Sequence, residues 1–303
     1  MAGRTSAGAG QGDGDVSIGT LLLELTQSLT GAGRDANEAR DIVAAVLDVP
    51  RLWPTTHRDT LVDSSAADEA REAARRLQRG APFAYAVGRS AFRYLTLAVD
   101  ERVLIPRAET EVLVDLVLEG MRSSPGGIAV DVGTGSGAIA LSLASEGNFD
   151  LVIASDVSLD ALAVAGANTR LLADELRAPV EFVHGVALVP FAGRHVRARV
   201  IVSNPPYIAH AERDDLPTAV RDWEPPMALF ADDDGLAVTR SIIRGAPEVL
   251  ESGGLLALEV DARRARRVAA MLEGDGRFRG VTVRDDLTGR ERFVLGRLAS
   301  EAD

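Results

Sequence analysis

The residues best suited to chemistry form a short loop, Ser203-Asn204-Pro205-Pro206-Tyr207, which directly follows an apolar segment. Two consecutive prolines fix the backbone and offer carbonyl acceptors without N–H donors. The Asn204 side chain adds an acceptor, and the Tyr207 ring offers a flat face for stacking. Together these groups predict a site that holds a planar –NH2 group, with acceptors for both hydrogens and a ring against its plane.

An amide nitrogen fits this site, and it is a poor nucleophile because its lone pair is delocalised. Holding both of its hydrogens favours pyramidalisation and aims the lone pair at a methyl group. We therefore expect Asn204, Pro205 and Tyr207 to be catalytic through positioning and electrostatics, without a strong base. Asn204, Pro205, Pro206 and Tyr207 are the expected substrate contacts. The alternative is a rigid turn whose asparagine caps the next segment.

A second loop, rich in glycine, lies between an expected strand and an expected helix. Its residues are Gly133, Thr134, Gly135, Ser136 and Gly137. Glycines in this context permit a tight turn and a close approach of the backbone to a nucleotide-type ligand. The spacing also satisfies the dinucleotide fingerprint, so the loop alone leaves an NAD enzyme open.

Two acidic residues sharpen the choice of ligand. Asp131 directly precedes the glycine loop, where a carboxylate suits the cationic amino-acid part of S-adenosylmethionine better than a pyrophosphate. Asp156 ends the next strand and can accept both ribose hydroxyls, a feature that NAD enzymes share. The pair favours S-adenosylmethionine, bound by Asp131, the glycine loop and Asp156. The alternative is a glycine-rich turn with two capping aspartates.

Alternating strands and helices must position these loops. The pattern predicts strands at 128–132, 151–154, 180–183, 200–202 and 255–260, and helices at 111–121, 138–144, 161–172 and 235–250. Such alternation is typical of an α/β fold, a mostly parallel sheet with helices on both faces. Residues 280–284 and 292–295 are expected to add an antiparallel edge hairpin. Loops that follow parallel strands then meet at one edge of the sheet.

The first third of the chain shows no such chemistry. Residues 1–16 are rich in glycine and alanine and are expected to be a disordered tail. Residues 17–82 predict a small all-α domain, with Ser17 as a helix cap and a polar helix over 63–79 that Gly80 ends. Residues 83–105 predict a β-hairpin linker with its turn at Asp100-Glu101. Residues 106–303 are the expected catalytic domain.

Composition narrows the function further. The 303 residues include no cysteine and four histidines without metal-ligand spacing, so we expect no metal site and a reducing, cytoplasmic setting. The net charge of −12 argues against a nucleic acid as the main partner. We expect the basic cluster of Arg263, Arg264, Arg266 and Arg267 to be the solvated face of a helix. No apolar run approaches the length of a membrane span, and we expect a monomer.

Taken together, the two loops resemble the HemK/PrmC family, protein-(glutamine-N5) methyltransferases that modify peptide-chain release factors. The similarity runs from about residue 17 to residue 298 and includes segments 80–88, 104–111, 131–137, 203–207, 221–229 and 284–292. It implies a Rossmann-like methyltransferase with a helical domain that docks the protein substrate. It also implies S-adenosylmethionine contacts at Gly133 to Gly137, Asp156 and Asn204, and glutamine contacts at Asn204 to Tyr207.

The chain departs from the family pattern at several positions. Ala108 replaces a proline, and Asp261 and Arg264 replace a glycine and a glutamine. Val186 aligns where the family has an acidic residue near adenine, and Ala187 follows it as an expected cofactor contact. These changes predict a divergent member, with weaker cofactor binding or a different protein target.

Three other functions stay open at this point. The first is glutamine methylation of a ribosomal protein. The second is amino-methylation of a nucleic acid base, because Asn-Pro-Pro-Tyr also occurs in such enzymes, although the acidic residues Glu212, Asp214 and Asp215 beside the site argue against it. The third is a non-catalytic binding protein, for which only Val186 speaks.

Overall fold

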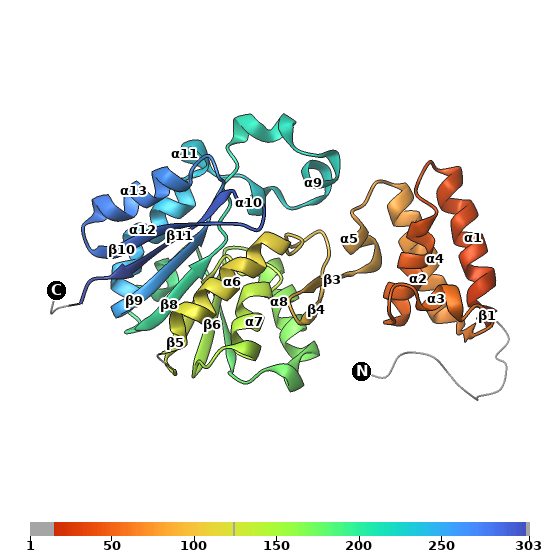
Figure 1. Ribbon diagram of the computed structural model, residues 1–303, viewed down its shortest axis with the longest axis horizontal. Helices are drawn as coiled ribbons and strands as arrows, with labels where there is room; N and C mark the ends of the chain where they lie inside the picture. Colours follow the sequence, from red (N-terminus) through yellow and green to blue (C-terminus); the bar gives the residue numbers. More distant parts are fainter. Residues whose placement is uncertain (1–14, 124, 301–303) are drawn as a thin grey trace. The chain divides into compact units, whose positions relative to one another are not determined.

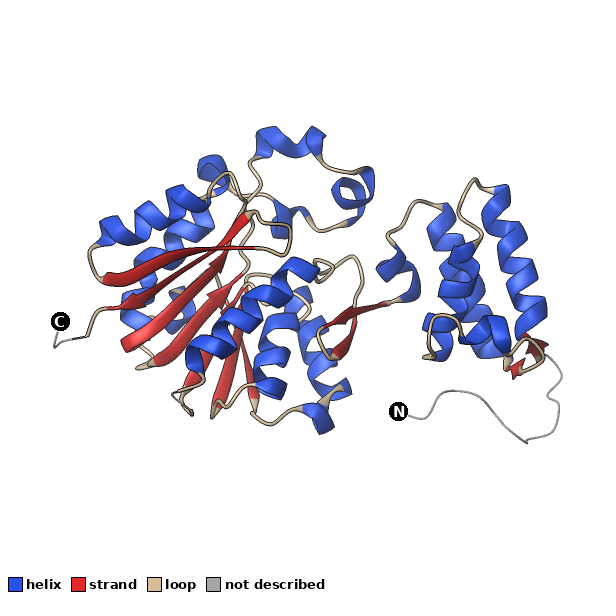
Figure 2. Ribbon diagram, in the orientation of Figure 1, coloured by secondary structure: helices blue, strands red, loops and turns tan. Residues whose placement is uncertain are grey.

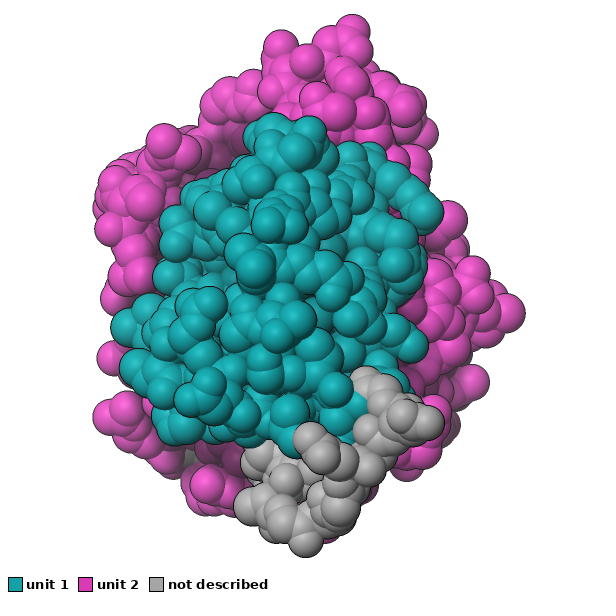
Figure 3. Space-filling view, turned by 90° about the vertical axis from the view of Figure 1, so that its right-hand side faces the viewer, with its two compact units in different colours: residues 1–89 teal, residues 90–303 magenta. Residues whose placement is uncertain are grey.

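The computed structural model describes residues 15–123 and 125–300, which form two compact units, 1–89 and 90–303 (Figure 3). The division falls inside the segment expected to be a linker. Most of the expected disordered tail lies outside the described residues. Val16 is described, and it belongs to a short strand instead of the tail, because it pairs with Val62.

The first unit is a helical bundle. Its elements are β1 (Val16–Ser17), α1 (Ile18–Gly31), α2 (Asn37–Leu47), α3 (Trp53–Thr56), β2 (Leu61–Val62), α4 (Ser64–Gln78) and α5 (Phe83–Val87). Ser17 caps α1, as predicted, by accepting from the Thr20 amide at 3.2 Å. Helix α4 buries a face of alanines against leucines of α1 and α2, so the helix that reads as polar carries its core contacts on small side chains.

The expected hairpin exists, but it is shorter than predicted. Residues Phe83–Val87 form helix α5. The hairpin consists of β3 (Arg89–Phe92) and β4 (Leu95–Ala98), with its turn at Arg93 and Tyr94. The turn predicted at Asp100-Glu101 lies beyond the hairpin. Arg93 fixes the observed turn, because its amide donates to Glu111 at 3.1 Å and its guanidinium pairs with Glu146 at 2.7 Å.

The second unit contains a seven-stranded sheet of order β10-β11-β9-β8-β5-β6-β7 (Figure 1). The strands are β5 (Ile128–Val132), β6 (Leu151–Asp156), β7 (Val180–His184), β8 (Ala198–Ser203), β9 (Leu250–Glu259), β10 (Phe278–Asp285) and β11 (Glu291–Leu298). Strands β5 to β9 are parallel, whereas β10 and β11 form the predicted antiparallel edge. The predicted α/β class is confirmed.

Helices cover both faces of this sheet (Figure 2). They are α6 (Ala108–Met121), α7 (Ala138–Glu146) and α8 (Leu159–Leu171) on one face, and α12 (Ala237–Val249) and α13 (Ala265–Asp275) on the other. Val130, Val132 and Leu258 point toward α12 and α13 and join one core with Ile242 and Val268.

Short helices that the sequence did not predict connect β8 to α12. They are η3 (His210–Asp215), α9 (Thr218–Trp223), α10 (Pro226–Leu229) and α11 (Asp232–Gly235). Ile208 and Phe230 bridge within this connection. In the parallel register, Val132 lies opposite both Ser155 and Ser203, and Ser203 lies opposite Leu258. The loops after β5, β6, β8 and β9 therefore leave the sheet at one edge.

Candidate active site

The glycine loop adopts the left-handed backbone that its composition predicts. Gly133, Gly135 and Gly137 have φ values of 76°, 55° and 87°. A Cβ at Gly133 or Gly135 would meet nothing within 4 Å, so their backbone angle, and not crowding, calls for glycine. The Gly133 and Thr134 amides donate to the Ser155 carbonyl at 2.8 and 3.0 Å.

Asp131 lies beneath this loop, fully buried. Its Oδ2 accepts from the Thr134 hydroxyl at 2.7 Å and from the Ala140 amide at 3.2 Å. Its Oδ1 has no hydrogen-bond partner in the described part of the chain. Burial raises the pKa of Asp131 to about 7. The carboxyl group thus fastens the loop to the start of α7, and its second oxygen is an unused acceptor.

Asp156 meets the same loop from the end of β6. Its Oδ2 accepts from the Gly135 amide and its Oδ1 from the Ser158 amide, both at 2.9 Å. Each carboxylate oxygen has lone pairs left for a ribose hydroxyl. These lone pairs and the left-handed glycine loop are compatible with the ribose of S-adenosylmethionine, whereas the unpartnered Oδ1 of Asp131 is itself buried.

Apolar side chains stand exposed beyond these acids. Val157, next to Asp156, is 42% exposed, and Val186, after β7, is 56% exposed. Ala187 is buried with φ of 47°, so the chain turns sharply there. Val157 and Val186 present apolar surface there, and the Val186 side chain has no hydrogen-bonding group.

The loop of residues 203–207, called the acceptor loop below, follows β8 and is hydrogen-bonded to the neighbouring strand β5. The Ser203 hydroxyl donates to the Val132 carbonyl at 2.6 Å. Asn204 Nδ2 donates to Thr110 Oγ1 at 3.1 Å, and Thr110 donates to Glu259 Oε2 at 2.7 Å. Asn204 Oδ1 accepts no hydrogen bond within the described residues, so it is an unused acceptor.

A cavity of about 290 Å³ opens beside this loop. Its lining residues are Leu104, Arg107, Asn204, Pro205, Tyr207, Ile208, Leu216, Val220, Ala228 and Leu229. Three of the four predicted substrate contacts therefore share one cavity, while Pro206 is not among these lining residues. Burial raises the pKa of Tyr207 to about 12, so its hydroxyl stays protonated at neutral pH.

Several residues of the site had no role assigned from sequence. Arg107, Thr110 and Glu224 lie in segments that resemble the family, which is the only signal that could have found them. Glu259 lies outside these segments, two residues before the departure at Asp261. Arg107 Nη2 donates to Glu224 Oε1 at 2.6 Å, and Glu224 is buried. Burial raises the pKa of Glu224, which Arg107 opposes.

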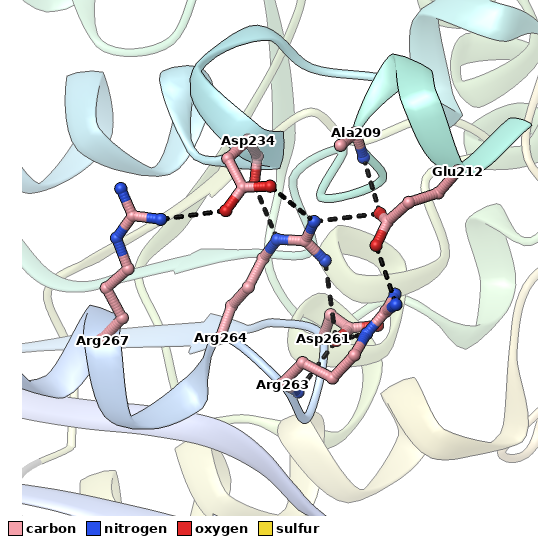
Figure 4. A network of polar contacts seen from close by, with 7 residues as sticks. All are labelled: Ala209, Glu212, Asp234, Asp261, Arg263, Arg264 and Arg267. Carbon is pink, nitrogen blue, oxygen red and sulfur yellow. Dashed lines mark hydrogen bonds and ion pairs between the residues drawn. The ribbon is translucent and has the colours of Figure 1, made fainter.

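The prediction of a solvated basic face is wrong for Arg264. This side chain is buried, because it donates to the Asp234 carbonyl at 2.6 Å and to Glu212 Oε2 at 2.9 Å (Figure 4). Glu212 also accepts from the Ala209 amide and pairs with Arg263. The network clamps both ends of the connection that supplies the outer wall of the cavity.

The end of the same connection packs closely against the acceptor loop. Asp233, Asp234 and Gly235 are three consecutive left-handed residues, with φ of 55°, 55° and 78°. A Cβ at Gly235 would collide with the carbonyl of Tyr207. Glycine is therefore required here both by its backbone angle and by this contact.

A glycine loop at the end of a parallel strand, in a seven-stranded sheet with helices on both faces, is the architecture of a Rossmann-like methyltransferase. Two family models match, "PrmC N-terminal domain" over residues 20–88 and "Methyltransferase small domain" over 109–220. The catalytic domain of hMettl16, solved with an RNA hairpin, shares the fold at a TM-score of 0.54 and 15% identity, over 80% of this chain and 84% of that one.

Relatives of known name specify the family. The release factor glutamine methyltransferases of Lactococcus lactis and Deinococcus radiodurans are 34% and 37% identical, over 90% and 92% of this chain and 98% of each relative. That of Moorella thermoacetica is 40% identical over 83% of this chain and 87% of its own. The chain belongs to the release factor glutamine methyltransferase family.

The described residues contain neither a membrane-spanning helix nor a metal-binding cluster. No helix within 15–123 or 125–300 has the length and apolarity to cross a membrane. Across those same ranges, no group of three or more histidine, aspartate or glutamate side chains is arranged to hold a metal ion.

Proposed function

We propose that this protein transfers a methyl group from S-adenosylmethionine to the side-chain amide nitrogen of a glutamine in a peptide-chain release factor, and so acts in translation termination. The observation that carries the proposal is the orientation of Asn204. Its Nδ2 is engaged by Thr110, which leaves Oδ1 as an acceptor in the loop that lines the cavity.

The cavity suits a glutamine side chain. Its wall is largely aliphatic, which accommodates the two methylene groups, and the polar residues that line it are Arg107, Asn204 and Tyr207. The acceptors that we assign to the amide are Asn204 Oδ1 and the Pro205 carbonyl. These two acceptors take the two hydrogens of the amide, and the Tyr207 ring stacks on its plane. Because Tyr207 keeps its proton, it acts through its ring and not as a base.

Residues at the neighbouring strand ends would hold the cofactor. Asp131 and Gly133 to Gly137 would receive its amino-acid part, Asp156 its ribose, and Ala187 its base, with Asn204 between cofactor and substrate. When bound, S-adenosylmethionine supplies an electrophilic methyl group. Asn204 and the Pro205 carbonyl would hold the two amide hydrogens and turn the nitrogen toward that methyl group, and one of these protons would pass to water once the nitrogen carries the methyl group.

The protein target follows from the relatives, whose names state release factor glutamine as the substrate. The helical unit of residues 1–89 is the part we assign to docking that protein. A release factor works on ribosomes, so the proposed setting is the cytoplasm. One chain carries every residue that we assign to the site, so we propose that the protein acts as a monomer.

The test is methyl transfer from labelled S-adenosylmethionine to a purified bacterial release factor, with mass mapping of the product. We expect the label on the glutamine of the Gly-Gly-Gln loop and none on a release factor with that glutamine changed to alanine. Ribosomal protein and RNA are assayed in parallel. Label on either of these, with none on the release factor, overturns the proposal.

A further inference from the structure

Two buried side chains outside the cavity lining continue the contacts of Asn204. Thr110, in the first turn of α6, is 5% exposed, and Glu259, at the end of β9, is 1% exposed. Asn204, Thr110 and Glu259 form one chain of hydrogen bonds, with lengths of 3.1 and 2.7 Å. Their three segments are far apart in sequence and meet only at this edge of the sheet.

Glu259 sets the donor-to-acceptor direction of these two hydrogen bonds. A carboxylate can only accept, so the single hydroxyl hydrogen of Thr110 must go to Glu259. Thr110 Oγ1 then has only lone pairs to offer to Asn204. It can receive Nδ2, whereas Oδ1 in that place would put two acceptors face to face. The charged Glu259 thereby decides which end of the Asn204 amide remains for the substrate.

We propose that Thr110 and Glu259 are positioning residues that hold Asn204 with its oxygen toward the glutamine amide. The inference rests on the proposed function, because it assigns the outward oxygen of Asn204 to a substrate N–H. Neither residue lines the cavity, so both act through Asn204 and not on the substrate itself.

The donor-to-acceptor direction of these hydrogen bonds reverses if Glu259 gains a proton. A neutral carboxyl group can donate to Thr110, whose hydrogen is then free for Asn204 Oδ1, and the amide turns its NH2 to the substrate. Two donors then face each other, and the methyl acceptor is no longer held. Burial raises the pKa of Glu259 to about 7, so this reversal falls near neutral pH.

Charged groups on the elements packed around Glu259 adjust this balance. Arg292 from β11 and Arg107 beside α6 favour the carboxylate, whereas Glu109 from α6 opposes it. The Tyr207 hydroxyl is also near, and its titration lies far above this range. Arg292 is itself held by Asp286 at 3.1 Å, so the strongest cationic neighbour is fixed in place.

The experiment compares Thr110→Val, Thr110→Ser and Glu259→Gln in the full chain. Valine has nearly the shape of threonine but no hydroxyl, while serine keeps the hydroxyl and is the matched control. For Thr110→Val we expect kcat to fall roughly 10–100-fold, with the KM for release factor and the Kd for S-adenosylmethionine within about twofold of wild type. Thr110→Ser should restore most of kcat.

The pH profile supplies a readout that a merely structural role would not move. Wild-type kcat should fall as pH drops below about 7, because Glu259 gains its proton, and Glu259→Gln should lose this limb of the profile. Wild-type kcat in Thr110→Val, or an equal loss in valine and serine variants, overturns the inference. A wild-type enzyme that leaves release factor unmethylated instead overturns the proposed function, so the two failures are distinct.

Discussion

The cofactor side of the site, around residues 131–137, and the acceptor side, around residues 203–207, both contain a buried pair of a carboxyl group and a threonine hydroxyl. The two pairs differ in how the chain brings them together. On each side a buried carboxyl group accepts from a threonine hydroxyl at 2.7 Å, Asp131 from Thr134 and Glu259 from Thr110. Burial raises both pKa values to about 7, and each group keeps one unpartnered oxygen in the described residues.

The difference is the distance along the chain. Thr134 is 3 residues from Asp131, whereas Thr110 is 149 residues from Glu259. The cofactor loop is held by β5, α7 and the end of β6, so all of these contacts come from three consecutive elements of the chain. The acceptor site exists only when the first turn of α6 and the ends of β8 and β9 are all in place, so it depends on the whole sheet.

The largest effect that would test this division is expected at Asn204. Asn204→Ala removes an acceptor for the substrate amide, and we expect kcat to fall by roughly 10²–10³-fold. Because the cofactor side is locally held, the Kd for S-adenosylmethionine should stay within a few-fold of wild type by calorimetry. Turnover like that of wild type would remove Asn204 from the mechanism.

Asp156→Ala is the reciprocal change on the cofactor side. It removes the acceptor assigned to ribose and the hydrogen bond from Gly135, so the Kd for S-adenosylmethionine should rise by about tenfold. At saturating cofactor, kcat should be close to that of wild type. An unchanged Kd would show that Asp156 serves only to shape the loop.

The buried carboxyl groups also predict how stability depends on pH. The pKa of Asp131 is about 7 in the fold against a model value of 3.8, so folding favours its neutral form. Its stabilisation is complete below about pH 4 and is lost as pH rises through about 7. Asp131→Asn should therefore raise the melting temperature at pH 8 by roughly 2–8 °C and by clearly less at pH 5.

The control for this prediction is Asp286→Asn. Hydrogen bonds from Thr288 and other nearby groups hold the pKa of Asp286 well below its usual range, so this change should destabilise the protein at both pH values. If Asp131→Asn also destabilises at pH 8, the hydrogen bonds of Asp131 outweigh its desolvation, and the parallel with Glu259 fails.

The smallest effect on activity is expected at Arg264, as a change in the KM for release factor. Arg264→Gln opens the clamp on the cavity wall, and we expect the KM for release factor to rise a few-fold while the Kd for S-adenosylmethionine is unchanged. Arg266→Gln is the matched control, since Arg266 is 77% exposed and such surface pairs contribute little. Equal KM values in the two variants would contradict the role of the clamp.

The same division explains what could be predicted from the sequence. The sheet, the glycine loop and the Asn-Pro-Pro-Tyr loop follow local patterns, and their strands and helices are found where expected. The roles of Thr110 and Glu259 could not be predicted, because they depend on contacts between distant segments. Arg264 looks like a surface arginine, and the acidic groups of Glu212, Asp234 and Asp261 make its burial possible.

The turn of the hairpin and the short helices before α12 could not be predicted from the sequence for a related reason. A turn at Asp100-Glu101 satisfies local propensity, but Arg93 has long-range carboxylate partners that fix the turn there instead. The helices α9 to α11 are too short to show a periodic pattern, and they are held by the clamp and by the bridge of Ile208 with Phe230.

Gly235 sets a limit for anyone who would redesign this enzyme for a larger acceptor. Any side chain there would push on the Tyr207 carbonyl, so the floor of the cavity has no freedom to retreat. Leu216, Val220 and Ala228 line the outer wall that the connection between β8 and α12 supplies, and none of them has a positive φ. Libraries that seek new amide substrates should therefore randomise that wall and leave position 235 unchanged.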